Sequence, residues 1–128
     1  MNTSIQYHIG LSENEGARYA ILPGDPGRVK EIAQYLEQPA FVAQNREFTT
    51  FSGILAGKRV LVTSTGIGGP SAAIALEELS HIGVDAIIRV GTCGGMQKHV
   101  SAGDLILPTA AVRMEGTSRE YTVSYTHL

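Results

Sequence analysis

The stretch TSTGIGGPSAAIALEEL, residues 63–79, joins the end of a predicted strand to a predicted helix through three glycines. Glycine is favoured where a chain turns through positive φ or where a ligand approaches main-chain atoms closely. After this loop, apolar residues return at the spacing of one helix face, and Gly83 follows near the end of the helix. This apolar face consists of Ala72, Ala75, Leu76 and Leu79. A strand, a glycine loop and a helix in this order are typical of α/β proteins.

The segments around this stretch continue the alternation of strands and helices. A second apolar stripe in residues 27–37 predicts a helix formed on Val29, Ile32, Ala33 and Leu36. The stretch 46–65 has the composition of two strands joined as a hairpin at residues 56–58. Further strands are predicted in residues 18–23, 85–91 and 104–114, and the second of these is expected to be buried on both faces. The sequence therefore predicts an α/β fold with helices on both sides of the sheet.

Composition and charge exclude several classes of function. The net charge is −2 and the arginines are scattered, which argues against a nucleic-acid or membrane-surface partner. No stretch approaches the roughly 18 apolar residues of a membrane span, and the N-terminus has no signal-peptide pattern, so a cytoplasmic location is expected. Cys93 is the single cysteine, which excludes an intramolecular disulfide. We expect Cys93 to be a small buried packing residue and not a nucleophile.

Three loops at the predicted carboxyl ends of strands are candidates for a ligand site: residues 23–28, 65–71 and 89–95. The first two lead into helices, whose free N–H groups suit an anion such as phosphate. Arg28, Arg89 and Thr92 add charge and a hydroxyl donor. Two alternatives stay open, because the first loop can be only a turn and Arg89 can instead pair with Glu77 or Glu78.

Two nucleotide-binding motifs are rejected. Ser71 stands where the third glycine of a dinucleotide fingerprint belongs, and Gly57-Lys58 is followed by Arg59 without the earlier glycine of a Walker A loop. His81, His99 and His127 have no metal-ligand spacing and receive no role.

Four segments together carry a resemblance to a known family. They are LPGDPGRVKEIA, NREFTTFSGILAGKRVLVTSTGIGGPSAAIALEEL, IIRVGTCGGMQ and AGDLILPTAAVRMEGTSREY. In this order and spacing they resemble the N-terminal half of the uridine phosphorylases, within the nucleoside phosphorylase-I family. The resemblance implies a three-layer sheet with helices on both faces and a homohexamer built from dimers. It also implies phosphorolysis of uridine to uracil and ribose 1-phosphate in pyrimidine nucleoside salvage.

The resemblance implies roles for individual residues. Gly24, Arg28, Arg89 and Thr92 match phosphate-binding positions, and Thr92 also matches a contact to the ribose. Arg46 and His8 match residues that reach the phosphate and the ribose of the neighbouring subunit. Glu47, Ile67 and Ser71 match positions that ligate a monovalent cation, usually potassium. Inorganic phosphate is the implied co-substrate, and no cofactor or acid–base residue is assigned.

The resemblance covers residues 8–121, about half of a family member, so we expect a truncated chain that is inactive alone. Residues 1–121 are expected to form the N-terminal part of one domain, and residues 122–128 an atypical tail. Other readings stay open: a purine nucleoside phosphorylase, a nucleosidase of the same fold that uses water, and a non-catalytic phosphate-binding fragment. Arg28, Arg46 and Arg89 together favour a phosphorylase over a nucleosidase.

Overall fold

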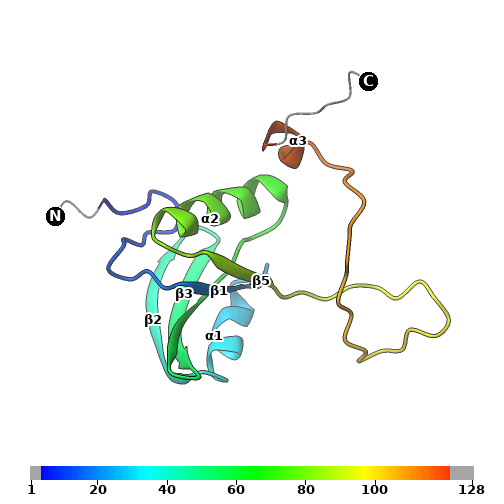
Figure 1. Cartoon of the computed structure of the whole chain (residues 1–128), viewed down its shortest axis with the longest axis horizontal. Coiled ribbons are helices and arrows are strands. Elements are labelled where there is room, and N and C mark those ends of the chain that lie inside the picture. Colours follow the sequence, from blue (N-terminus) through cyan, green and yellow to red (C-terminus); the bar gives the residue numbers. More distant parts are fainter. Residues whose placement is uncertain (1–3, 122–128) are drawn as a thin grey trace. The chain divides into compact units, whose positions relative to one another are not determined.

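The computed structural model describes residues 4–121 and divides the chain into two compact units, Met1–Val90 and Gly91–Leu128. The first unit holds a sheet and two helices, and the second holds a long loop run that leads into a short helix (Figure 1). Residues 122–128, predicted to be an atypical tail, lie outside the described residues. That residues 1–121 form part of a single domain stays a prediction.

A five-stranded mixed sheet with the strand order β2-β3-β4-β1-β5 forms the centre of the first unit. Strand β1 (Tyr19–Leu22) pairs in parallel with β4 (Lys58–Thr63) on one side and with β5 (Ala86–Arg89) on the other. Strands β2 (Glu37–Asn45) and β3 (Phe48–Leu55) extend the sheet by antiparallel pairing. Because parallel strands end at the same edge, the segments that follow β1, β4 and β5 start from one edge of the sheet.

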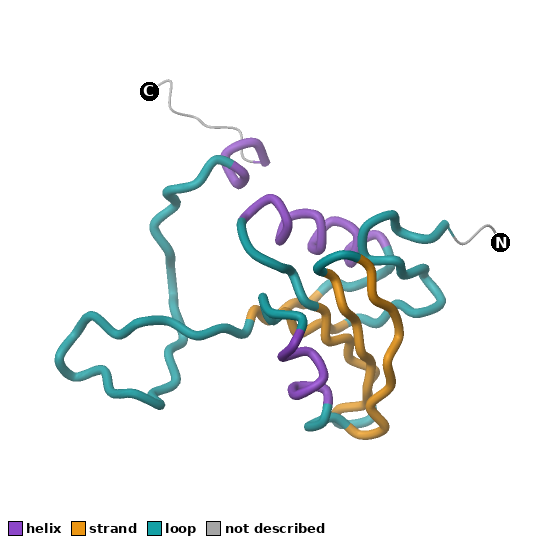
Figure 2. The backbone as a smooth tube through the Cα atoms, turned by 180° about the vertical axis from the view of Figure 1, so that it is seen from behind, coloured by secondary structure: helices purple, strands orange, loops and turns teal. Residues whose placement is uncertain are grey.

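Helices α1 (Gly27–Ala33) and α2 (Gly69–His81) cover opposite faces of this sheet (Figure 2). Successive side chains of a strand point to opposite faces. In β1, Ala20 and Leu22 pack in the core cluster that contains α2, whereas Tyr19 and Ile21 pack against the cluster that contains α1. The predicted α/β sheet with helices on both faces is thus confirmed.

The turns of the first unit follow the glycine pattern of the sequence. The β3–β4 hairpin turns at Ala56 and Gly57, whose φ values are 50° and 72°. Two successive positive φ values match the twist of the flanking strands, so the predicted hairpin is confirmed. The loop before α2 has positive φ at Gly66 and at Gly68, which is the N-cap, and Pro70 lies in the first turn of the helix.

Strand β5 differs from the prediction that it is buried on both faces. It is an edge strand, and Ile88 is 66% exposed. The β-branched run indicated a strand correctly, but the number of neighbours that a strand receives depends on segments distant in sequence.

Strand β2 was not predicted. Its pairing with β3 has two register shifts, and it contains Pro39 and a positive φ of 51° at Gln38. An edge strand tolerates such residues because one side of its backbone needs no partner. They also remove the regular alternation by which a strand is found in sequence.

The second unit contains no strand among its described residues, so the strand predicted over residues 104–114 is wrong. Leu105 and Leu107 are 92% and 86% exposed. A strand needs another strand to pair its backbone groups, and no described segment of this unit supplies one. The described part of this unit ends in helix α3 (Thr117–Tyr121), where the Glu115 carboxylate accepts from Ser118 N at 3.1 Å. Cys93, predicted to be buried, is exposed.

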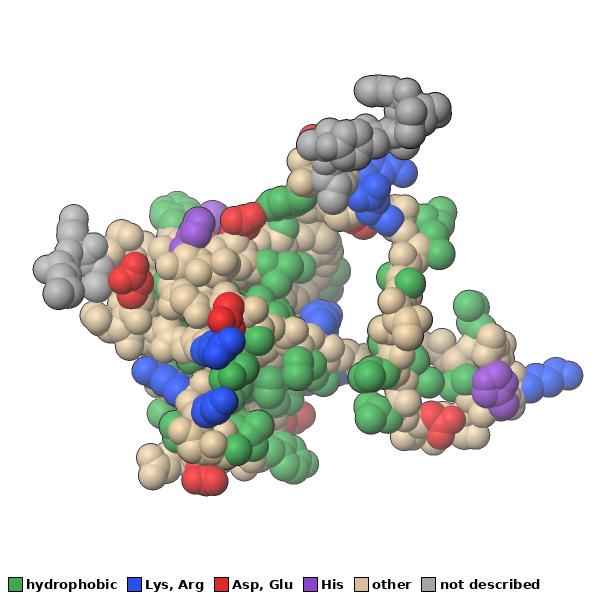
Figure 3. Space-filling view, in the orientation of Figure 1, with side chains coloured by type: hydrophobic (Ala, Val, Ile, Leu, Met, Phe, Trp, Pro, Cys, Tyr) green, Lys and Arg blue, Asp and Glu red, His purple; other side chains and the backbone are tan. Residues whose placement is uncertain are grey.

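The surface matches the expectation from composition. Lysine and arginine side chains are interspersed with acidic ones on the visible face and form no continuous basic patch (Figure 3). Between residues 4 and 121, no helix combines the length and apolar character needed to cross a membrane.

Candidate functional site

The loops after β1 and β4 are joined by main-chain hydrogen bonds. Thr65 N donates to Pro23 O at 3.0 Å, and Gly66 N donates to Gly24 O at 2.9 Å. At the end of β5, Val90 N donates to Leu22 O at 3.0 Å. These bonds fix the first two candidate loops against each other at the carboxyl edge of the sheet.

Arg89 lies directly against the first of these loops. A methyl group on Gly24 would lie 3.0 Å from Arg89 Nη2 and 3.4 Å from Gly66 O. Glycine at this position therefore gives the guanidinium room beside the backbone. Three of the residues selected from sequence, Gly24, Gly66 and Arg89, thus meet at one place.

The guanidinium of Arg89 is held by carbonyl oxygens. Nη1 donates to Leu22 O at 3.2 Å and to Val90 O. Within residues 4–121 no carboxylate lies within ion-pair distance of Arg89. The alternative partners are engaged elsewhere, Glu78 with His8 at 2.6 Å and Glu77 with His81 at 4.0 Å. Arg89 is also exposed, contrary to the expectation of a buried strand end. Carbonyl oxygens orient the group without neutralising it, so its charge is available to an anion.

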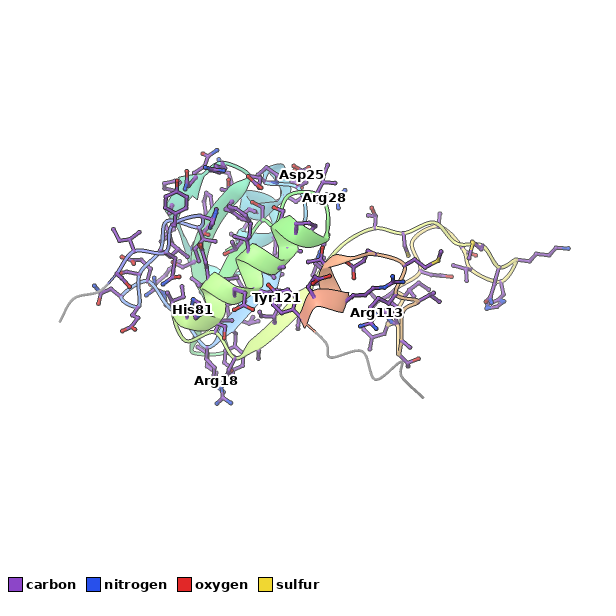
Figure 4. The ribbon with its side chains drawn as sticks, turned by 90° about the horizontal axis from the view of Figure 1, so that it is seen from above. Arg18, Asp25, Arg28, His81, Arg113 and Tyr121 are labelled. Carbon is purple, nitrogen blue, oxygen red and sulfur yellow. The ribbon has the colours of Figure 1, made fainter. Side chains whose placement is uncertain are left out.

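The start of α1 offers less to an anion than its sequence indicated. The Asp25 carboxylate accepts from Gly27 N at 2.9 Å, and Arg28 N donates to Asp25 O at 3.2 Å. These N–H groups already have partners within the loop. Arg28 itself is exposed beside Asp25 (Figure 4), so its side chain is the part of this loop that can reach a ligand.

Glu47 and Ser71, two of the three predicted cation ligands, lie together. Ser71 Oγ lies 2.8 Å from Glu47 Oε1 and 2.6 Å from Thr65 O. Donation from the Glu47 backbone N–H and from the Ser71 hydroxyl holds the pKa of Glu47 below its ordinary value. A methyl group on Gly66 would lie 2.7 Å from Glu47 Cγ, so the glycine leaves space for this carboxylate.

This cluster suits a weakly bound cation. It combines one ionised carboxylate with hydroxyl and carbonyl oxygens, and oxygen ligands suit hard cations. No group of three or more His, Cys, Asp or Glu side chains gathers anywhere in the described part of the chain. Ile67, the third predicted ligand, lies in the same loop with its side chain 99% exposed.

The remaining predicted site residues lie in separate places. Arg46 is exposed in the β2–β3 turn with a φ of 52°. His8 lies in a turn before β1 and contacts Glu78 of α2. Thr92 belongs to the second unit, where it is exposed. Sequence reasoning missed the pairing of His8 with Glu78, because nothing in a local pattern joins residues 70 positions apart.

Comparison with known proteins gives one consistent result. Residues 18–126 match the profile of the phosphorylase superfamily. The chain is 52% identical to the uridine phosphorylase of Treponema pallidum over 94% of its own length and 46% of the relative. It is 47% identical to the uridine phosphorylase of Escherichia coli, over 94% and 49% of the two chains. A guanosine phosphorylase of Halorubrum lacusprofundi is 46% identical over 91% and 48%. The chain thus spans about half the length of the curated relatives it matches.

Proposed function

The chain belongs to the phosphorylase superfamily, and from this premise we propose that it carries the phosphate-binding elements of a uridine phosphorylase. The reaction would convert uridine and inorganic phosphate to uracil and ribose 1-phosphate. The observation that carries this proposal is the placement of Arg89, whose uncompensated guanidinium lies against Gly24 at the carboxyl edge of the sheet.

The proposed chemistry relies on positioning and charge. A phosphate oxygen attacks C1′ of the ribose while the bond to the base breaks, and the base leaves with the bonding electrons and takes a proton. Positive charge builds on the ribose as the bond breaks, so an anion held beside C1′ stabilises that charge and also supplies the nucleophile. Arginine suits this task because its planar donors bind phosphate oxygens in pairs.

Each predicted residue has a role in this proposal. Arg28, Arg89 and Thr92 bind phosphate with the backbone at Gly24, and Arg46 reaches the phosphate of a neighbouring subunit. His8 and Thr92 contact the ribose. Potassium would be held by Glu47, Ser71 and the Ile67 carbonyl, as a structural ion that takes no part in the reaction. A homohexamer built from dimers that serves cytoplasmic pyrimidine salvage belongs to the same proposal, and its support is the likeness to uridine phosphorylases.

Turnover by a fusion protein tests the proposal. Residues 1–121 are joined to the C-terminal half of the Treponema pallidum uridine phosphorylase, and uracil release from uridine is followed with and without phosphate. We expect release that depends on phosphate and becomes much slower when Arg89 is replaced by alanine. Release without phosphate would indicate a nucleosidase instead, and phosphate binding without any turnover would indicate a binding fragment.

A purine nucleoside is the second candidate substrate, because a guanosine phosphorylase is among the similar proteins. The fusion does not decide this point, since its base-binding half would come from the relative. Guanosine and uridine are therefore offered, each with phosphate, to cells that overproduce the protein at its natural length. Faster consumption of guanosine would replace uridine in the proposal.

A shared active site can be tested by mixing subunits. Fusion subunits carrying Arg46→Ala are combined with subunits carrying Arg89→Ala, each inactive alone. Hybrids regain activity if Arg46 acts across the interface, because some sites then receive both arginines. Hybrids that assemble and recover no turnover would place Arg46 in its own subunit's site.

A further inference from the structure

One carboxylate on α2 collects three donors from a single turn. Glu78 is 9% exposed, and its two oxygens accept from His8 N at 3.1 and 3.0 Å. Oε2 also accepts from Ile9 N at 2.8 Å, and Oε1 lies 2.6 Å from His8 Nδ1. The segment before β1 is therefore fastened to α2 through this side chain.

The charge of Glu78 decides which nitrogen of His8 carries a proton. Burial alone would raise the pKa of Glu78, but the hydrogen bonds from Ile9 and His8 outweigh it and hold the pKa below its ordinary value. An ionised carboxylate can only accept hydrogen bonds. Nδ1 of His8 must therefore be the protonated nitrogen, which leaves Nε2 for another partner.

Two further residues contact the turn that carries His8. Asn45 Nδ2 donates to Tyr7 O at 3.1 Å and to His8 O at 2.9 Å, which fixes the backbone of the turn. The Tyr7 ring meets the imidazole edge to face, with centroids 4.9 Å apart. The His8 side chain is still 31% exposed, and no described residue of the chain makes a hydrogen bond to Nε2. A ring that is held this firmly and keeps one nitrogen free is suited to receive a ligand.

We infer that Glu78 is a positioning residue, which holds His8 as the Nδ1–H tautomer and presents Nε2 as an acceptor for a ligand hydroxyl group. The inference rests on the proposed function for the identity of that group, a hydroxyl of the ribose. Glu78 touches no substrate in this arrangement and acts only through His8. Its carboxylate fixes the tautomer and the ring orientation of His8, as a carboxylate that accepts a hydrogen bond from a metal-bound histidine does for that ring.

The tautomer of His8 can be measured without any activity. In the 128-residue chain with ¹⁵N-labelled histidine, at a pH well above the ordinary imidazole pKa, the nitrogen shifts distinguish Nδ1–H from Nε2–H. We expect His8 to be the Nδ1–H form, and we expect Glu78→Gln to raise the share of Nε2–H. Glu77→Gln is the matched control, because this exposed neighbour on α2 lies 4.0 Å from His81 and, within residues 4–121, forms no hydrogen bond or ion pair with His8.

Two results would overturn the inference. One is an Nε2–H tautomer at His8 in the unsubstituted chain, a reading that does not depend on any variant folding. The other is an unchanged tautomer in a folded Glu78→Gln chain, with folding checked by circular dichroism.

Kinetics of the fusion protein separate positioning from a structural role. Glu78→Gln should raise KM for uridine about tenfold, the size expected for one lost hydrogen bond, and leave KM for phosphate unchanged. In a His8→Ala background the same substitution should add nothing, because its effect passes through His8. Equal losses in both backgrounds would show that Glu78 only supports the fold. If the fusion has no turnover, the proposed function fails, and the tautomer measurement still decides the role of Glu78.

Discussion

The glycine-rich loops of the two units have similar sequences and different structures. In the first unit the run 66–69 follows a strand and begins a helix, and its backbone bonds to the loop after β1. In the second unit the run 91–95 is exposed throughout and begins no helix or strand. Glycine therefore permits a tight loop, whereas the neighbouring strands fix its conformation by supplying hydrogen-bond partners.

Hydrogen exchange should show the largest contrast between the two units. Amides of β1 and β4 are bonded within the sheet, so the slowest of them should exchange on the order of a thousandfold more slowly than those of residues 104–114. Exchange of the 128-residue chain followed by mass spectrometry checks this. Protection of residues 104–114 that equals that of β1 would remove the contrast. Protection of residues 104–114 that appears only in the fusion protein would show that this segment forms a strand when another strand pairs with it.

Replacing one leucine in each unit by alanine should lower the free energy of unfolding by very different amounts. Leu61 is fully buried in β4, whereas Leu107 is 86% exposed. Leu61→Ala should lower the free energy of unfolding by about 2–5 kcal/mol. Leu107→Ala should change it by less than about 0.5 kcal/mol. Urea unfolding monitored by circular dichroism measures both, and a large loss with Leu107→Ala would mean that residue 107 packs in a core.

Removing the guanidinium of Arg89 should weaken phosphate binding. A hydrogen bond to a charged group contributes about 1.5–3 kcal/mol, so Arg89→Ala should reduce the affinity roughly tenfold or more. Arg18→Ala is the matched control, because Arg18 pairs with Asp85 at 2.9 Å and lies far from Arg28 in Figure 4. Calorimetric titration with inorganic phosphate gives both affinities. Equal affinity in the Arg89 variant and the parent chain would refute the phosphate site.

A smaller effect on phosphate is expected from Gly24→Ala. The added methyl group would press on Arg89 Nη2 at 3.0 Å and shift the guanidinium by a few tenths of an ångström. Off-rotamer strain costs about 0.5–1.5 kcal/mol, which corresponds to a loss of about twofold to tenfold in affinity. Gly116→Ala in the second unit meets nothing within 4 Å and serves as the control. Matching affinities in the two variants would show that Gly24 is free of Arg89 in solution.

Acid should act on the two units through different carboxylates. The pKa of Glu78 is lowered by hydrogen bonds to Ile9 and His8, and that of Glu115 by bonds to Ser118. A carboxyl group with a lowered pKa in the folded state stabilises the fold above its unfolded pKa, and this contribution is lost as the pH falls through the folded value. Glu78→Gln should therefore flatten the fall in stability below about pH 4.5. Glu115→Gln should leave the stability of the sheet nearly unchanged, since the described hydrogen bonds to Glu115 come from its own turn of the second unit. Urea unfolding at a series of pH values compares the variants, and an equal response would contradict the assignment.

Sequence patterns predicted the parts of the fold that depend on local periodicity. The stripe of Ala75 and Leu79 predicted α2, and Ala56-Gly57 predicted the hairpin turn, because both features are decided within a few residues. The strand over residues 104–114 was wrong for the opposite reason, since an apolar run becomes a strand only if another strand pairs with it.

The sequence predicted which residues belong to the candidate site better than it predicted which of them touch. Gly24 and Arg89 were selected from sequence, and they meet because β1 and β5 are neighbours in the sheet. The open alternative that Arg89 pairs with Glu77 or Glu78 is wrong, because these carboxylates lie beside His81 and His8. Helix α2 could be predicted without knowing which segment would cover it. Local patterns identify the side chains that can do chemistry, and the pairing of distant strands and helices decides which of them touch.

The position of β1 between β4 and β5 has a consequence for the order of folding. The β3–β4 hairpin joins residues adjacent in the chain, whereas β1 pairs Tyr19 with Val60 on one side and with Ala86 on the other. Contacts between distant residues form slowly, because a long loop must close before any of them is gained. β1 leaves the ribosome before both of its neighbours and must wait for them. During synthesis the apolar side chains of β1 therefore stay without their full set of sheet neighbours until β5 has emerged.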